Sequence, residues 1–411
     1  MSVYVDLIRD NLEYRRLWLA RVISNFGDWF NLLASAALIT SLTGAGVAVS
    51  YLFLARFLPV FVMSPFAGVL ADRYERRLIM AATDVLRAVT VLCFLLIRTA
   101  DQLWLLYFLT VVQFILSSLY TPAHSALLPS IVAPRDLVTA NALDSFTWST
   151  MLAIGSLFGG LAAAALGVAA AFVIDALTFL LAAWFVLRIG SVPSGDYVHR
   201  AGFFDFVDGL RYLRSRRFIL VLSLVKAAGA LVWGAVNVLE IPLAEQVFPF
   251  RGSGSVTLGI IYAATGIGTG AGPLVARHFL GDGRQAALRA ITGSFAILTA
   301  GVLLLGTSPT LPWVVTATVM RAVGTGTLWV FSSTILQSTV ENRYRGRVFA
   351  FEFAALTLLQ SVSTLWAGLA VDRLQLAVQT VFVLTSVGSL AVTLAWLAFH
   401  LRASHRPVPA A

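Results

Sequence analysis

Twelve long apolar stretches constrain this chain more than any other feature, because each is long enough to cross a lipid bilayer as a helix. Charged residues make up only 12% of the 411 residues, too few for the surface of a soluble protein. The apolar runs are continuous, which excludes a transmembrane β-barrel. We therefore predict an all-α membrane protein with twelve transmembrane helices, near residues 17–41, 46–71, 78–98, 103–128, 138–164, 168–189, 218–244, 255–276, 286–306, 311–336, 349–371 and 376–400.

The basic residues lie mostly on one side of these spans. Of the 29 Lys and Arg residues, 21 fall in the two tails and in or beside the loops after even-numbered spans. Only Arg98, Arg251 and Arg373 lie on the other side. The positive-inside rule therefore places both termini in the cytoplasm. Because the positive charge follows the topology and is spread over seven segments, we expect a lipid bilayer and no nucleic acid as partner.

An internal repeat divides the chain into two halves. Shifting the sequence by 208 residues places Asp144 on Glu352, at corresponding ends of corresponding spans. Such a parallel repeat predicts two pseudo-symmetric six-helix bundles, over residues 1–189 and 218–411. Residues 190–217 would be a cytoplasmic basic linker with an amphipathic helix. Because one chain supplies both bundles, we expect a monomer.

Sequence motifs for catalysis or cofactor binding are missing from the chain. There is no phosphate-binding G-x-x-x-x-G-K-[ST], no metal-ligand spacing among the five His residues, and no catalytic pair of carboxylates. The segment Gly266–Pro273 is glycine-rich, but it lies inside an apolar span with no strand before it. We therefore expect a protein that is not an enzyme and holds neither a metal nor a cofactor.

Polar residues recur along one helical face of spans one, four, seven and ten. These faces carry Arg21, Asn25, Asp28 and Ser35; Gln113, Ser117, Tyr120 and His124; Lys226, Trp233, Asn237 and Glu240; and Arg321, Thr325, Trp329 and Ser332. A charge at the bilayer centre costs roughly 2.5–3.5 kcal/mol, so these faces need partners or a wet cavity. A cavity with a few charges and broad aromatic walls favours amphipathic organic solutes over sugars.

Asp28 is the first candidate for substrate contact or coupling, since it lies about half-way through span one. The alternative is a permanent ion pair, with Arg21 or with Arg56 of span two, that only joins helices.

Lys226 is the only lysine of the chain. Glu240 lies about 21 Å away along the same helix at 1.5 Å per residue, too far for an ion pair. We expect Lys226 to contact Glu352, Asp144 or an anionic group of the substrate. Asp175 in span six has no partner or role that the sequence indicates.

The loop after span two, GVLADRYERR, resembles the hallmark G-x-x-x-D-R-x-G-R-R of the major facilitator superfamily. Glu75 departs from the pattern, where a second glycine is usual. The resemblance implies a cytoplasmic charge latch that holds one state of a rocking transporter, and it also implies that spans one, four, seven and ten line a central cavity. The matching residues are Gly68, Asp72, Arg73, Arg76 and Arg77. The gating residues that we add to them are Asp84, Arg87, Asp144 and Glu352.

Other stretches resemble the branch of that superfamily that exports drugs, macrolides and siderophores. They are SNFGDWF in span one, YTPAHSALLP at the end of span four and ENRYRGRVFA entering span eleven. GSLFGG at Gly155–Gly160 resembles the G-P-x-x-G-G of exporters, with Ser156 in place of proline, and predicts close helix packing. Many exporters have a coupling arginine in span four, where Gln113 stands here.

The resemblance implies a secondary transporter of a bacterial plasma membrane. It would export amphipathic organic compounds by alternating access, with protons as the coupling ion. Two alternatives stay open. A flippase for lysophospholipid or another lipid predicts lateral openings and no response to a proton gradient. A membrane sensor or scaffold predicts no translocation at all and tolerance of Asp28→Asn.

Overall fold

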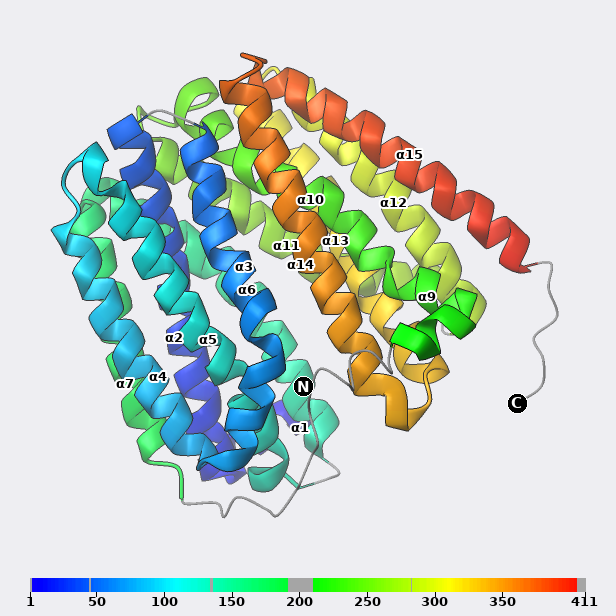
Figure 1. Ribbon diagram of the computed structural model, residues 1–411, viewed down its shortest axis with the longest axis horizontal. Helices are drawn as coiled ribbons and strands as arrows, with labels where there is room; N and C mark the ends of the chain where they lie inside the picture. Colours follow the sequence, from blue (N-terminus) through cyan, green and yellow to red (C-terminus); the bar gives the residue numbers. More distant parts are fainter. Residues whose placement is uncertain (1, 44–45, 134–135, 191–209, 282, 405–411) are drawn as a thin grey trace. The chain divides into compact units, whose positions relative to one another are not determined.

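The computed structural model describes residues 2–43, 46–133, 136–190, 210–281 and 283–404, and these are almost entirely helical (Figure 1). The side chains of residues 64–73 are not among those described. The predicted all-α class is confirmed, since the described residues include no β-structure beyond one isolated bridge between Phe250 and Ser253.

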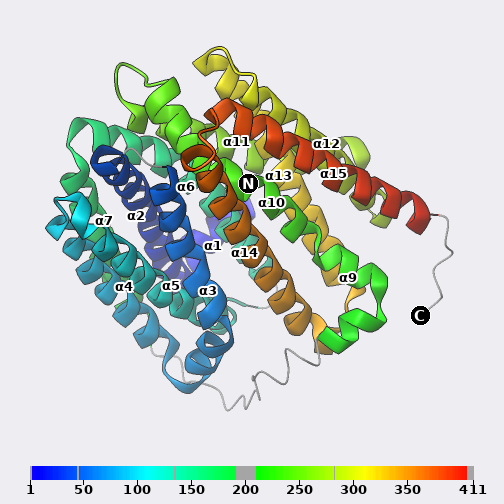
Figure 2. The same cartoon turned by 45° about the horizontal axis from the view of Figure 1, so that its top comes forward.

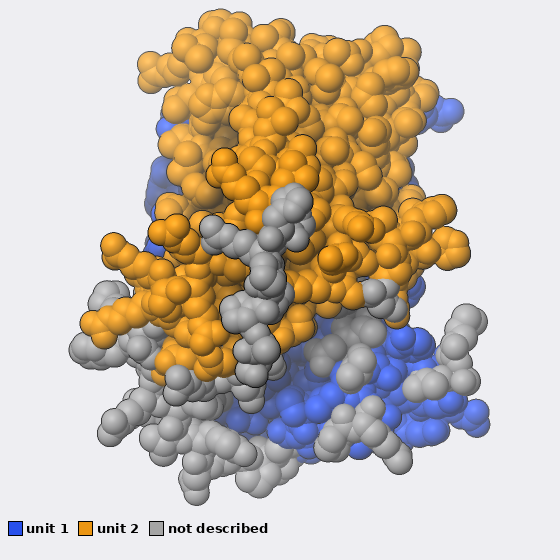
Figure 3. Space-filling view, turned by 90° about the vertical axis from the view of Figure 1, so that its right-hand side faces the viewer, with its two compact units in different colours: residues 1–205, 244–263 blue, residues 206–243, 264–411 orange. Residues whose placement is uncertain are grey.

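The chain forms two compact units, distinguished by colour in Figure 3. Unit 1 comprises residues 1–205 and 244–263, and unit 2 comprises residues 206–243 and 264–411. The predicted bundles over 1–189 and 218–411 remain a prediction. Of the predicted linker, residues 191–209 lie outside the described residues, while residues 210–215 are helical with Tyr212 and Leu213 buried.

Unit 1 contains the first seven helices. They are α1 (Ser2–Asp10), α2 (Leu12–Thr43), α3 (Gly46–Arg73), α4 (Arg76–Cys93), α5 (Leu103–Ile131), α6 (Leu137–Ala165) and α7 (Val168–Leu187), with the 3-10 turns η1 (Phe94–Leu96) and η2 (Ala100–Gln102) between α4 and α5. Helix α7 packs against α2 and also against α4, and Figures 1 and 2 show these three helices grouped together within unit 1. Side chains from α2 and α4 can therefore meet in the interior of this unit.

Unit 2 is built from the later helices. They are α9 (Arg217–Ser223), α10 (Val225–Pro242), α12 (Arg284–Gly306), α13 (Leu311–Thr339), α14 (Asn342–Asp372) and α15 (Val378–Ser404). The π-helical turn η4 (Leu243–Val247) follows α10, and α11 (Gly254–Leu280) begins among the residues of unit 1 and continues into unit 2. The predicted span 218–244 is interrupted at Leu224, between α9 and α10. Helix α13 begins at the predicted residue, because Pro312 in its first turn lacks an N–H that would be unpaired there in any case.

Eleven helical segments among the described residues are long and apolar enough to cross a membrane. The remaining predicted span, 46–71, lies in α3, whose described apolar part is the shorter segment Val47–Met63. The helices form because a bilayer offers no hydrogen-bond partners, so the backbone must satisfy its own N–H and C=O groups. The chain is thus a multi-pass membrane protein.

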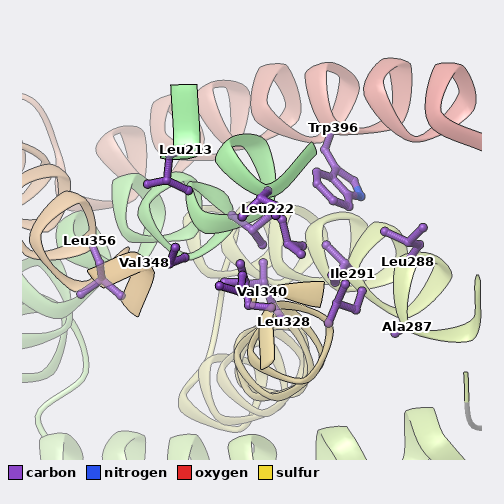
Figure 4. Close-up of a cluster of buried hydrophobic side chains, with 14 of the residues drawn as sticks. Leu213, Leu222, Ala287, Leu288, Ile291, Leu328, Val340, Val348, Leu356 and Trp396 are labelled. Atoms are coloured by element: carbon purple, nitrogen blue, oxygen red, sulfur yellow. The ribbon is translucent and has the colours of Figure 1, made fainter. Parts of the chain in front are cut away.

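A cluster of buried apolar side chains holds unit 2 together. Leu222, Ile291, Leu328 and Trp396, from α9, α12, α13 and α15, belong to this cluster (Figure 4). Lipid tails are as apolar as leucine, so such a cluster stabilises the unit by close packing more than by escape from water.

The GSLFGG segment of α6 makes the close contact that its small residues predict. A Cβ atom on Gly160 would collide with the backbone carbonyl of Ser255 in α11, and one on Gly259 would lie 2.9 Å from the Ser156 carbonyl. Ser156, in the place of the family's proline, donates its hydroxyl hydrogen bond to the Leu152 carbonyl of its own helix. Two backbones can approach this closely only where side chains are absent.

Candidate functional site

A polar cavity of about 180 Å³ lies inside unit 1. Its principal lining side chains are Arg21, Asn25 and Asp28 from α2, Arg87 from α4, Tyr120 from α5 and Trp148 from α6. The helical faces of spans one and four therefore share a cavity, together with two residues from other helices. Gln113, from the same face of α5 as Tyr120, is buried and is not part of the lining.

The central contact of this cavity is an ion pair between Asp28 and Arg87. Arg87 Nη2 donates a hydrogen bond of 2.7 Å to Asp28 Oδ1, and Arg87 Nη1 lies 3.6 Å from Asp84 Oδ1, one helical turn away. The guanidinium also stacks over the Phe179 ring of α7, 4.0 Å from its centroid. The Arg87 side chain is only 4% exposed, whereas that of Asp28 is 28% exposed. Asp28 is therefore the member of the pair that a solute in the cavity can reach.

This geometry corrects one expectation. The ion-pair partner of Asp28 is neither Arg21 nor Arg56 but Arg87, which the sequence had suggested for the cytoplasmic latch. The reason is that α2 and α4 both pack on α7, which brings side chains 59 residues apart in sequence into contact. Arg56 instead stacks over Phe114, 4.6 Å from the ring centroid, and interacts electrostatically with Asp28.

Asp175 on α7 has no exposed surface, like Asp84 on α4. It packs against the backbone of Gly27, where an added Cβ atom would lie 2.6 Å from Asp175 Oδ1. It interacts electrostatically with Asp28, Arg87 and Arg56. The sequence had indicated no role for Asp175. The fold places its side chain against Gly27, the neighbour in sequence of the cavity-lining Asp28.

A second group of charges surrounds Asp144. Its Oδ2 atom lies 4.0 Å from Arg21 Nε and 3.7 Å from His124 Nε2. The expected partners were arginines of the loops, Arg135 and Arg345, whose side chains lie outside the described residues. Asp144, on α6, therefore contacts the cavity-lining face of α2 through Arg21.

In unit 2, Lys226 forms a buried ion pair with Glu352. Lys226 Nζ donates hydrogen bonds of 3.0 Å to Glu352 Oε2 and 2.7 Å to Ser333 Oγ. It also lies 4.5 Å from the ring centroid of Trp329, which in turn lies 6.4 Å from that of Trp233. Of the expected contacts for Lys226, the structure contains the one with Glu352.

A second buried ion pair joins Glu240 of α10 to Arg321 of α13, and sequence reasoning did not pair them. Arg321 also donates a hydrogen bond of 3.0 Å to Thr265 Oγ1. Both side chains are at most 3% exposed. Each lies on its predicted polar face, but the sequence held no signal that paired the two. Asn237, one turn from Glu240, is half-buried.

The arginines that resemble a latch hold the ends of neighbouring helices. Arg76 donates a hydrogen bond of 3.0 Å to the Ala126 carbonyl of α5, and Arg77 donates one of 2.6 Å to the Ile189 carbonyl after α7. Glu75, the departure from the family pattern, pairs with Arg77 at 3.0 Å. The side chains of Gly68, Asp72 and Arg73 lie outside the described residues, so their part in the latch remains a prediction.

The profile described as "Major Facilitator Superfamily" matches residues 17–358. The chain belongs to the Major Facilitator Superfamily. Among the described residues of this transporter, no three His, Cys, Asp or Glu side chains cluster as metal ligands would.

Several relatives of this Major Facilitator Superfamily member are named as exporters. It is 28% identical over 373 residues to the uncharacterized MFS-type transporter YfiS of Bacillus subtilis, covering 86% of this chain and 85% of that protein. It is 24% identical to the putative bacilysin exporter BacE of Bacillus subtilis, with 87% and 88% covered. It is 22% identical to macrolide efflux protein A of Streptococcus pyogenes, with 88% and 90% covered.

Solved structures agree with the superfamily's fold. A mutant of the nucleoside transporter NupG matches with a TM-score of 0.76 at 13% identity, covering 94% of this chain and 99% of that one. A bacterial homologue of the human lysosomal transporter Spinster, inward-facing and unoccupied, matches with a TM-score of 0.73 at 15% identity, covering 97% and 98%. At such low identity these likenesses establish the fold alone.

Proposed function

We propose that this protein exports amphipathic organic cations across a bacterial inner membrane, in exchange for protons and by alternating access. The observation that carries the proposal is the Asp28–Arg87 pair in the polar cavity of unit 1, with Asp28 open to the cavity. A carboxylate shared between a fixed arginine and a cavity can exchange that arginine for a cationic solute. The exporter names of two relatives, for bacilysin and for macrolides, support an outward direction.

The cavity walls support the proposed substrate class. Trp148 is 48% exposed and lines the same cavity as Asp28, so a ring face and a carboxylate are both accessible there. A cation over a tryptophan ring gains about 0.5–2 kcal/mol, more when water is excluded. Arg21 and Asn25 add polar contacts for other parts of the solute.

The topology that this function needs is proposed with it. Twelve spans in two six-helix bundles, both termini in the cytoplasm and a monomeric chain would provide the halves that rock. Unit 2 would contribute two ion pairs to this transport cycle, Lys226 with Glu352 and Arg321 with Glu240. Latch residues Gly68, Asp72, Arg73, Arg76 and Arg77 would stabilise one end state. Asp84 would act through Arg87, and Asp144 through Arg21.

Transport of ethidium by proteoliposomes tests the proposal. An imposed pH gradient should drive ethidium across the membrane in wild type, and Asp28→Asn should lose that movement. Asp101→Asn is the matched control, because Asp101 is an exposed aspartate in η2, outside the cavity. Gradient-driven ethidium movement that persists in Asp28→Asn would remove Asp28 from the transport mechanism.

One observation favours a lipid substrate as the second candidate. An apolar cavity of about 400 Å³ lies between α3 and α5, and Leu54, Leu58, Val62, Val111 and Ile115 are among its lining residues. Such walls suit an acyl chain. A flippase predicts that labelled lysophospholipid moves between leaflets whether or not a pH gradient is applied, whereas ethidium does not move. Movement of neither probe would favour a sensor or scaffold.

A further inference from the structure

A group of charged side chains in and around the cavity of unit 1 holds one more carboxylate than guanidinium groups. Its described charged residues are Asp28, Asp84, Asp144 and Asp175, against Arg21, Arg56 and Arg87. Arg21 lies beside Asp144 and balances it. Three carboxylates then share two guanidinium groups. An uncompensated charge inside a membrane protein is strongly unfavourable, so this group of five is neutral only when it holds one proton.

The contacts of the three carboxylates differ. Asp28 accepts a hydrogen bond of 2.7 Å from Arg87, and Asp84 lies 3.6 Å from the other terminal nitrogen of the same guanidinium. Asp175 forms no ion pair of this kind with any described residue, and a neutral group, the side-chain amide of Asn31, lies beside it. Asp175 is thus the carboxylate with the least compensation.

The position of Asp175 isolates it from water but not from the cavity. The side chain has no exposed surface, and it packs directly on the backbone of Gly27. Asp28 is the next residue of α2, so a change in the charge of Asp28 acts on Asp175 at short range. Arg87 and Arg56 interact with both carboxylates.

We propose that Asp175 is the group that carries the exchanged proton, protonated when the cavity is empty and ionised when Asp28 binds a cationic solute. This inference rests on the proposed function. When the solute takes the place of Arg87 beside Asp28, the guanidinium is free to compensate Asp175. The O–H bond of the Asp175 carboxyl then breaks, its electron pair stays on the carboxylate, and the proton leaves to water by way of the adjacent cavity that Asp28 lines. One positive charge enters as one leaves, so the group stays neutral.

The other carboxylates near Asp175, which are Asp28, Asp84 and Asp144, each have a guanidinium nitrogen within 4.0 Å. The elements that pack on α7 contribute Asp28 and Asn31 from α2, Asp84 and Arg87 from α4, and Asp144 from α6. Arg56 from α3, with Tyr120 and His124 from α5, completes the surroundings. His124 is buried, which opposes a charge on its ring, and it lies beside Arg21 and Asp144, whose charges balance each other. Tyr120 is buried and does not ionise in the working range of a proton exchanger.

Infrared spectroscopy can locate the proton if the charges are left unchanged. We would prepare the protein by cell-free synthesis with carboxyl carbon-13 aspartate and compare wild type with Asp175→Glu, Asp28→Glu and Asp84→Glu at neutral pH. The band of a protonated carboxyl should shift with the label in wild type, Asp28→Glu and Asp84→Glu. In Asp175→Glu it should stay at the unlabelled position, because an unlabelled glutamic acid then holds the proton.

Several results would overturn the assignment: no protonated-carboxyl band in wild type, a band that still shifts in Asp175→Glu, or one that stops shifting in either other variant. The bands of Asp28→Glu and Asp84→Glu keep the test decisive if Asp175→Glu does not fold.

Binding of tetraphenylphosphonium then tests the coupling between the cation and the proton. Its binding to wild type should abolish the band and release about one proton per cation bound, and binding that leaves the band intact would refute the coupling. If the band is present and tetraphenylphosphonium does not bind, the proposed cation export fails and the protonation of Asp175 stands.

Discussion

The Lys226–Glu352 pair offers a sharp test of how buried charges stabilise unit 2. Replacing Lys226 with methionine leaves the Glu352 carboxylate, 4% exposed, without its cation. Replacing Glu352 with glutamine leaves the ammonium, which keeps its hydrogen bond to Ser333 and its place over the Trp329 ring. The double substitution removes both charges. We expect the double variant to be more stable than Lys226→Met alone.

The separation and the burial set the size of the effect. Two unit charges 3.0 Å apart attract each other by roughly 5 kcal/mol at an effective dielectric constant of about 20. Removing one partner of a buried pair costs about 3–5 kcal/mol, and we expect Lys226→Met near the top of that range, because one Glu352 oxygen already lacks a hydrogen bond. The Trp329 ring offsets about 0.5–2 kcal/mol of the loss in Glu352→Gln.

A second ion pair in the same unit serves as the control. Arg216 and Glu341 lie closer together, at 2.6 Å, but their side chains are 49% and 42% exposed. Exposed pairs contribute about 0.2–1 kcal/mol, so the cycle of Arg216→Met and Glu341→Gln should show little coupling. The free energy of unfolding would be measured in mixed dodecyl sulphate micelles by circular dichroism. Additive single effects at Lys226 and Glu352, or equal coupling in both cycles, would refute the argument that burial decides the outcome.

Two further predictions concern other buried contacts. Gly27→Ala should lower the free energy of unfolding by about 1–3 kcal/mol, because its methyl group would overlap Asp175 and Thr178, and thermal unfolding that matches wild type would contradict the packing of α2 on α7. Arg321→Met should lower the free energy of unfolding by about 3–5 kcal/mol, because it leaves Glu240 buried and unpaired. Adding Glu240→Gln should restore part of that stability. A double variant less stable than Arg321→Met in the same micelle assay would argue against the pair.

The helices were predictable because the bilayer imposes a simple rule on every span. A crossing segment must be apolar and helical, so length and hydropathy alone predicted twelve spans, and eleven of them coincide with described helices that are long and apolar enough to cross. The polar faces were predictable from helical periodicity. Asp28 and Tyr120, chosen from two such faces, lie in one cavity.

The pairing of charges was not predictable, because it depends on which helices are neighbours. Arg87 belongs by sequence to the cytoplasmic half of its span, yet its long side chain reaches Asp28 through the shared contact of α2 and α4 with α7. Glu240 and Arg321 carried the right depth but no indication of each other. Asp175 stands alone in an apolar helix, and only its close contact with Gly27 of α2 shows that it lies beside Asp28.

The burial of Lys226 also determines how the protein responds to chemical reagents. It is the only lysine, and its ammonium group is enclosed by Glu352, Ser333 and an indole ring, with 6% of the side chain exposed. A protonated, enclosed amine does not attack an activated ester. Acylation of this side chain therefore requires unit 2 to open and the amine to lose its proton. The rate of acylation would measure how often unit 2 opens during turnover.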